Sequence, residues 1–221
     1  MLIFKFPAIF GQKVALLGDF NNWRFDKDLL EKEGDEWVID IEISKGIHRY
    51  KFLIDDKLWI NDPYADMYVN NRTGSLNSVI QLDSDDVVRV SKEYGIIDDI
   101  GMDNNFNEIV LMKKSEGENR EFNISGQQIY IYNSIKECIG EVEVTYVWCR
   151  PDLKVFESDS TLLKATGGEE RLYNYINLRG EDFKPGLWRV FILINGRLLA
   201  TEEFLIKSNF YYHKRGMILV K

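Results

Sequence analysis

The chain has few cysteines, few histidines and no surplus of positive charge, and each shortage excludes a class of function. Its 221 residues include two cysteines, two histidines and four prolines, and its formal net charge is -8. Nucleic acids and anionic membrane surfaces need clustered Lys and Arg, so neither is expected as a partner. Two cysteines with His48 and His213 give no metal-site spacing, so we expect no metal and no other cofactor. A neutral ligand suits this composition better.

Long hydrophobic runs are also absent. The first residues, MLIFKFPAIFGQKVALLGDF, have no basic stretch before the apolar ones, and Lys5, Pro7 and Lys13 interrupt them. We therefore expect neither a secretory signal nor a membrane span. This predicts a cytoplasmic protein in which Cys138 and Cys149 are reduced thiols within a core rather than a disulfide.

Apolar and aromatic residues are plentiful enough to fill cores. They make up 45% and 13% of the chain, and its length suits two small domains better than one. We expect domains at 1–84 and 108–221, joined by an acidic linker at 85–107. Short strand patterns separated by turn residues run through both halves, which predicts an all-β protein. The expected architecture is two immunoglobulin-like (early-set type) β-sandwich domains in tandem.

Alternation with a period of two marks the strands of the first half. Trp37–Ile43 alternates in this way, which assigns Trp37 to the core. The next strand is expected to bury His48, Tyr50, Phe52 and Ile54. Lys51 then falls on the opposite, exposed face of that strand. A hairpin turn at Asp55–Lys57 brings Trp59 back beside Lys51.

Polar side chains and tryptophans gather in or beside the connections. Phe20–Trp23 forms a turn after a short strand at 13–18, which lifts Trp23 off the strand end. The polar set is Asn21, Asn22, Lys51, Ser75 and Asn77. A sugar ring stacks its apolar face on an indole while its hydroxyls bond amide or ammonium donors. The pattern alone also allows the alternative that Trp23 and Trp59 close the ends of the sandwich as core residues.

Three motifs in order, GDFNNW, KGIHRYKFLIDDKLWINDP and TGSLNSVIQL, resemble a known family. They are similar, over residues of about 10–82, to the family 48 carbohydrate-binding modules, and in particular to the glycogen-binding module of the AMP-activated protein kinase β subunit. The resemblance implies non-catalytic binding of an α-1,4-glucan such as glycogen, starch or maltodextrin. It places ring stacking on Trp23 and Trp59 and a hydroxyl contact on Lys51. The complete predicted sugar site is Trp23, Lys51, Trp59, Asn22, Thr73, Ser75 and Asn77.

One loop departs from the family pattern. The family often has a leucine there that projects through the helical glucan, whereas Arg72 or Thr73 stands at this place. The departure favours an alternative, a structural or regulatory protein-interaction module that has lost sugar binding. No phosphate loop, nucleophile elbow or metalloprotease motif appears, so we expect no enzyme. The expected class of protein partner is a glycan-acting enzyme or a kinase.

The second half contains strand patterns of the same kind, at 109–112, 128–132 and 141–148. The last of these places Trp148 with Val142, Val144 and Tyr146 on one face, which predicts a core residue. Asn195-Gly196 is the strongest hairpin signal in the chain. Together with the segment 184–189, this hairpin resembles the closing strands of immunoglobulin-like domains, and we expect the second domain to serve assembly or positioning. The tail at 210–220 is expected to be a terminal strand rather than a partner-docking segment.

Overall fold

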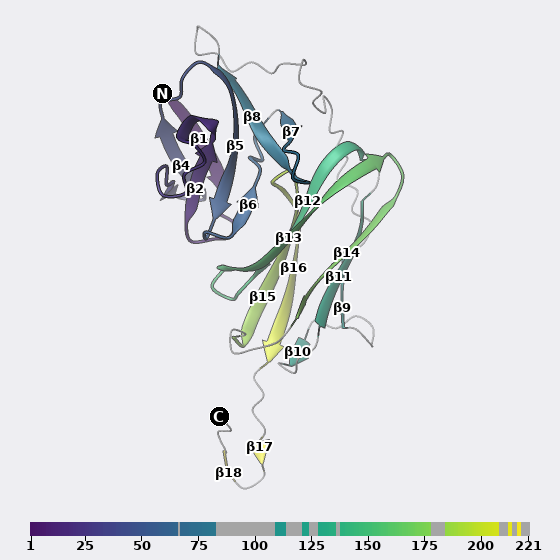
Figure 1. The fold of residues 1–221 in the computed structure, drawn as a ribbon. Coiled ribbons are helices and arrows are strands. Elements are labelled where there is room, and N and C mark those ends of the chain that lie inside the picture. The colour runs from purple at the N-terminus through teal and green to yellow at the C-terminus, as the bar shows by residue number, and fades with distance from the viewer. Residues whose placement is uncertain are drawn as a thin grey trace.

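The chain is built from β-strands. The computed structural model describes residues 1–65, 67–82, 109–113, 121–123, 128–135, 138–177, 184–207, 212–213 and 216–217. Within them the only helical element is a short 3-10 helix, η1 (Asp19–Asn21). The predicted all-β class, with two immunoglobulin-like β-sandwich domains in tandem, is confirmed (Figure 1). The linker predicted at 85–107 lies outside the described residues, and the domain boundaries stay a prediction.

The N-terminal domain pairs a three-stranded sheet with a larger one. The first sheet has the order β1 (Leu2–Pro7), β4 (Glu36–Ile41) and β3 (Glu31–Glu33). The second has the order β2 (Val14–Gly18), β5 (Gly46–Ile54), β8 (Leu76–Leu82) and β7 (Tyr68–Asn70), and β6 (Leu58–Ile60) pairs with β5. The predicted inward residues of this domain, Trp37, His48, Tyr50, Phe52 and Ile54, are all buried. The alternation therefore placed this core correctly.

The second domain also has two sheets. The larger has the order β10 (Glu121–Asn123), β16 (Arg197–Lys207), β15 (Gly186–Ile194), β12 (Ile139–Cys149) and β13 (Val155–Thr166). The smaller has the order β14 (Glu170–Asn177), β11 (Gln128–Ile135) and β9 (Ile109–Lys113). Trp148 is buried in the core between these sheets, as predicted.

The hairpin predicted at Asn195-Gly196 joins β15 to β16, and both residues have positive φ, as a tight two-residue turn requires. The C-terminal tail differs from its prediction. Among the tail residues that the structure describes, β17 (Tyr212–His213) and β18 (Gly216–Met217) pair with each other in a two-stranded sheet.

The two domains share one apolar cluster. The outer face of the larger C-terminal sheet contributes Val147, Cys149, Val155, Phe191 and Leu193 to the core of the N-terminal domain. At this contact the rings of Phe10 and Phe191 have centroids 5.0 Å apart. The backbone N–H of Gly11 donates to the carbonyl oxygen of Leu153 at 2.9 Å. Buried apolar contact of this kind restricts the relative motion of the two domains.

Both cysteines are free and buried, as predicted. Burial raises the pKa of the Cys138 thiol, and it raises that of Cys149 further. Because only the thiolate attacks a disulfide reagent, we expect the native chain to react with Ellman's reagent about 100-fold or more slowly than the urea-unfolded chain. Absorbance at fixed reagent concentration measures both rates. Fast reaction of two thiols in the native chain would contradict the buried placement.

Candidate functional site

The GDFNNW motif forms a tight turn at the end of β2. A Cβ on Gly18 would lie 2.6 Å from the ring of Phe20 and 2.7 Å from the carbonyl oxygen of Arg49, so only glycine fits. The Asp19 carboxylate accepts hydrogen bonds from the Arg49 backbone N–H and from the indole N–H of Trp23, both at 3.1 Å. Asp19 therefore fixes the position of the Trp23 ring.

Asn21 holds the turn together from inside. Its side-chain oxygen accepts from the Gly18 N–H at 2.9 Å, and its amide donates to the Leu16 carbonyl and to Asp28. Its side chain is buried, so Asn21 serves the fold rather than a ligand. Asn22, by contrast, is exposed at the tip of the turn.

Two consecutive residues of this turn have left-handed backbone conformations. The φ angles are 56° at Asn22 and 58° at Trp23. A positive φ is common for asparagine but a genuine outlier for a bulky residue such as tryptophan. Strain of this kind collects at functional sites, because there the position of a side chain matters more than local stability. The turn therefore holds Trp23 in place at the expense of backbone conformational energy.

The two predicted tryptophans lie side by side on the outer face of the larger N-terminal sheet. Trp59 on β6 faces Leu53 in the ladder, and 42% of its surface is exposed. Trp23 is partly buried and packs against a small apolar cluster, which consists of Ala15, Leu17 and Leu53. The ring centroids are 6.2 Å apart and the ring planes are tilted by 49°. The alternative in which both rings close the sandwich core does not hold for Trp59, which is open to solvent.

The exposed position expected for Lys51 is wrong. The side chain lies on the outer face of β5, as its alternation predicted, but the residue is only 4% exposed. Burial lowers the pKa of its ammonium group, while the nearby Glu143 carboxylate acts in the opposite direction. The cause of the burial is the second domain, which covers this end of the sheet.

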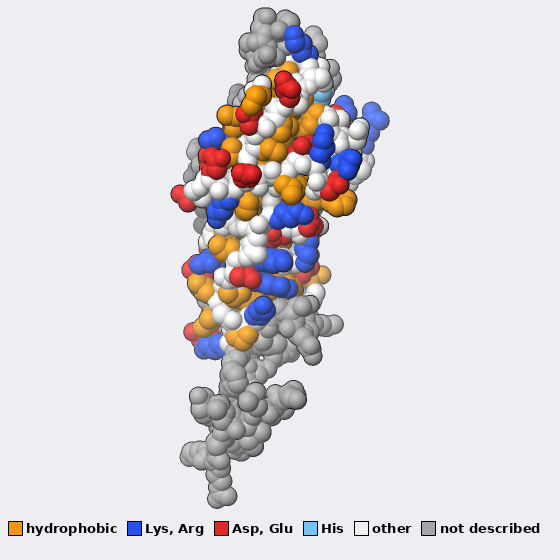
Figure 2. Space-filling model, turned by 90° about the vertical axis from the view of Figure 1, so that its left-hand side faces the viewer, with side chains coloured by type: hydrophobic (Ala, Val, Ile, Leu, Met, Phe, Trp, Pro, Cys, Tyr) orange, Lys and Arg blue, Asp and Glu red, His pale blue; other side chains and the backbone are white. Residues whose placement is uncertain are grey.

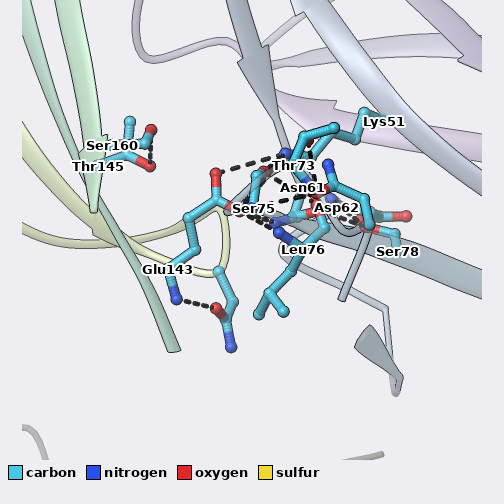
Figure 3. Close-up of polar contacts among 12 residues, drawn as sticks. Lys51, Asn61, Asp62, Thr73, Ser75, Leu76, Ser78, Glu143, Thr145 and Ser160 are labelled. Carbon is cyan, nitrogen blue, oxygen red and sulfur yellow. Dashed lines mark hydrogen bonds and ion pairs between the residues drawn. The ribbon is translucent and has the colours of Figure 1, made fainter. Parts of the chain in front are cut away.

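Glu143, on β12 of the second domain, accepts the hydrogen bonds of the polar groups around Lys51 (Figure 3). The Lys51 ammonium lies 3.3 Å from one oxygen of its carboxylate, and the pair is 5% and 3% exposed at the side chains. The other oxygen accepts from the Ser75 hydroxyl and the Leu76 N–H, both at 2.7 Å, and from the Asn61 amide at 3.2 Å. The carboxylate is thus bonded by groups from three segments of the N-terminal domain.

The remaining predicted site residues divide between the exposed and the buried part of this face. Thr73 is exposed in the loop before β8, where its N–H and hydroxyl both bond the side-chain oxygen of Asn71. Ser75 donates to Glu143, and Lys51 donates to the Ser75 oxygen at 2.5 Å. Asn77 is buried on β8. The structure therefore brings Trp23, Trp59 and Asn22 to the surface and encloses Lys51 and Asn77.

Acidic and basic side chains are interspersed over the face of the molecule drawn in Figure 2, and apolar side chains lie among them on the N-terminal domain. Among the described residues, no cluster of three or more His, Cys, Asp and Glu side chains could hold a metal ion. No helix within the described part of the chain is long and apolar enough to cross a membrane.

The N-terminal domain is similar to a known family of domains. Residues 2–88 match the family described as the glycogen recognition site of AMP-activated protein kinase. The chain is 27% identical over 129 residues to the mouse 5'-AMP-activated protein kinase subunit beta-2, covering 56% of this chain and 41% of that protein. It is 36% identical over 81 residues to the pig subunit beta-1, covering 34% of this chain and 63% of that sequence. The chain thus spans less than half the length of the mouse relative.

A solved immunoglobulin-like protein from Pseudomonas aeruginosa is also similar, with 15% identity and a TM-score of 0.33 over 46% of this chain and 93% of that one. The resemblance predicted from the three motifs is confirmed: the N-terminal domain is similar to the glycogen recognition domain of the AMP-activated protein kinase β subunits.

Proposed function

We propose that the N-terminal domain binds α-1,4-glucan, such as glycogen, starch or maltodextrin, without catalysing a reaction on it. The observation that carries this proposal is the pair of adjacent indoles, Trp23 and Trp59, on an outer sheet face. The strained backbone of Trp23 and the hydrogen bond from its indole to Asp19 support a presented ring rather than a core ring. The family match over residues 2–88 supplies the ligand class.

The geometry of the site suits weak binding of an uncharged sugar. A glucose ring offers a face of C–H groups to an indole, and its rim of hydroxyls can bond side chains beside the rings. Exposed Asn22 and Thr73 are the predicted polar residues that remain available for this role. Because a neutral sugar loses good hydration on binding, a shallow site with two rings gives affinities on the order of µM to mM.

We assign the second domain a positioning role. Its larger sheet packs against the N-terminal core and so fixes the orientation of the tryptophan face. A kinase or a glycan-acting enzyme is the proposed partner class, by analogy with the relatives named as kinase subunits. A reducing, cytoplasmic location is supported by the two free, buried thiols.

Trp59→Ala is expected to weaken binding of maltoheptaose by about 1–3 kcal/mol, or roughly 5- to 150-fold, because one stacked ring is lost. Trp59 is 42% exposed and belongs to none of the buried core clusters, so its removal leaves the core intact. Isothermal titration calorimetry and tryptophan fluorescence on the full chain measure the affinity. Tyr64→Ala is the matched control, since Tyr64 is 60% exposed in the same domain and lies outside the ring pair.

Two results would count against the proposal. A wild-type chain that shows no response to several millimolar maltoheptaose would remove glucan binding. Equal affinities of Trp59→Ala, Trp23→Ala and wild type would show that sugar binds elsewhere on the chain.

A second candidate function is protein docking by a module that has lost sugar binding. The enclosure of Lys51 favours it, because the family's hydroxyl contact is then unavailable. The second domain offers a docking surface of its own, a face of four tyrosines on β11 and β14; they are Tyr130, Tyr132, Tyr173 and Tyr175, with neighbouring ring centroids 5.4–6.2 Å apart. Tyrosine is enriched at protein interfaces. This candidate predicts no response to maltoheptaose in either domain.

A further inference from the structure

The tryptophan face continues toward the second domain along β5 and β6. Leu53, which packs against Trp23, is two residues from Lys51 on β5, and Asn61 directly follows β6, the strand that contains Trp59. Residues two apart on a strand share a face and are about 6–7 Å apart. The hydrogen-bond donors that contact Glu143 therefore lie next to the two tryptophan rings, about one i to i+2 step along the strand toward the second domain.

These donors are of the kind that a sugar hydroxyl would meet. They comprise an ammonium group, a hydroxyl, an amide and a backbone N–H, from Lys51, Ser75, Asn61 and Leu76. In this chain a single carboxylate accepts hydrogen bonds from all four. A buried, bonded ion pair excludes other ligands, since removing either charge leaves its partner unpaired away from water.

We infer that Glu143 is a specificity-determining residue. Its carboxylate, which comes from the second domain, occupies the polar groups beside the tryptophan pair, so sugar contacts end at the two rings. A short glucan segment then fills the whole site. The inference rests on the proposed function. Lys51 is then a positioning residue that fixes the second domain and does not contact sugar.

The contact is one of several polar and apolar contacts between the two domains. The Asp55 carboxylate accepts from the Val155 N–H at 2.9 Å with one oxygen and from the Gln12 N–H at 2.7 Å with the other. Asn195, beside the β15–β16 turn, bonds the backbone of Glu143 in both directions, through its side-chain oxygen at 2.8 Å and its own N–H at 2.9 Å. The bonds from Asn195, which is in the same domain as Glu143, hold the Glu143 backbone in place, and the shared apolar cluster holds the two domains together.

The first test compares glucans of different length by calorimetry on the full chain. A heptasaccharide offers about five overlapping trisaccharide registers, so a site that ends at the rings should bind maltoheptaose no more than about tenfold more tightly than maltotriose. A gain well beyond tenfold would overturn the inference, because sugar would then make contacts past the tryptophans. No binding of either sugar would instead remove the proposed function.

The second test replaces the ion pair without leaving a charge unpaired. In the double variant Lys51→Met and Glu143→Gln, the glutamine oxygen still accepts from Ser75 and Leu76. Its maltoheptaose affinity should stay within about twofold of wild type, whereas Trp59→Ala loses roughly 5- to 150-fold. A loss of tenfold or more in the folded double variant would show that Lys51 reaches the sugar.

A third measurement does not depend on sugar. Acetylation of the native chain with an amine-reactive ester, read by mass spectrometry, should leave Lys51 unmodified while it modifies Lys13, whose side chain is 43% exposed. Equal modification of the two lysines would overturn the enclosure of Lys51 even if no glucan bound.

Discussion

Glu143→Ala is expected to lower the free energy of unfolding by about 3–5 kcal/mol, because it removes one partner of a buried ion pair and leaves the Lys51 charge unpaired. The same change leaves the Ser75 hydroxyl, the Leu76 N–H and the Asn61 amide without their shared acceptor. Each unsatisfied buried donor adds to the loss. Urea denaturation followed by fluorescence measures the change.

Glu141→Ala is the matched control for this variant. Glu141 lies two residues earlier on β12, on the same face, and is paired at the surface with Lys164 at 3.3 Å. An exposed pair of this kind contributes about 0–1 kcal/mol, so the control should unfold close to wild type. Similar losses in both variants would mean that the Glu143 contact contributes no more than a surface ion pair.

Gly196→Ala is expected to destabilise the chain by about 3–5 kcal/mol through overpacking together with left-handed backbone strain. An added Cβ would lie 2.0 Å from the Asn61 carbonyl oxygen, which belongs to the other domain, and the φ angle is +82°. Neither backbone can retreat easily, because both adjoin buried strands. Thermal denaturation and the chemical shifts of the Asn61 region report the stability loss and the displaced contact.

Gly34→Ala is the control that separates the cost of the left-handed backbone from the cost of the steric contact at Gly196. Its φ is +61°, but a Cβ there would meet nothing within 4 Å. Only the conformational penalty of about 1 kcal/mol is then expected. If Gly196→Ala cost no more than Gly34→Ala, the close approach of the two domains at Asn61 would be excluded.

The elements of this fold are readable from short-range patterns. Alternation placed Trp37 and Trp148 in their cores, and turn residues located the hairpins at Asp55–Lys57 and at Asn195-Gly196. These predictions succeed because a side chain's direction in a strand follows from its neighbours in sequence. The shared role of Trp23 and Trp59 was implied by the family resemblance of the three motifs and not by alternation or turn residues.

The environment of Lys51 could not be obtained in the same way. Alternation assigned its side chain to the correct face, but it carries no information about what covers that face. The partner, Glu143, is 92 residues away, in a strand whose outer residues resemble an ordinary solvated face. Turn chemistry likewise could not show that Asn21 is a buried clamp while its neighbour Asn22 is exposed.

Because the two sandwiches share one apolar cluster, the N-terminal domain of this chain is a poor candidate for transfer into another protein. A fragment cut at residue 84 would expose Phe10 and the edge of its core to water, where Phe191 and Leu193 now lie. Newly bared apolar surface promotes aggregation. Tandem architecture here does not imply modularity, and fusion or truncation designs should retain the sheet that contains β12 and β15.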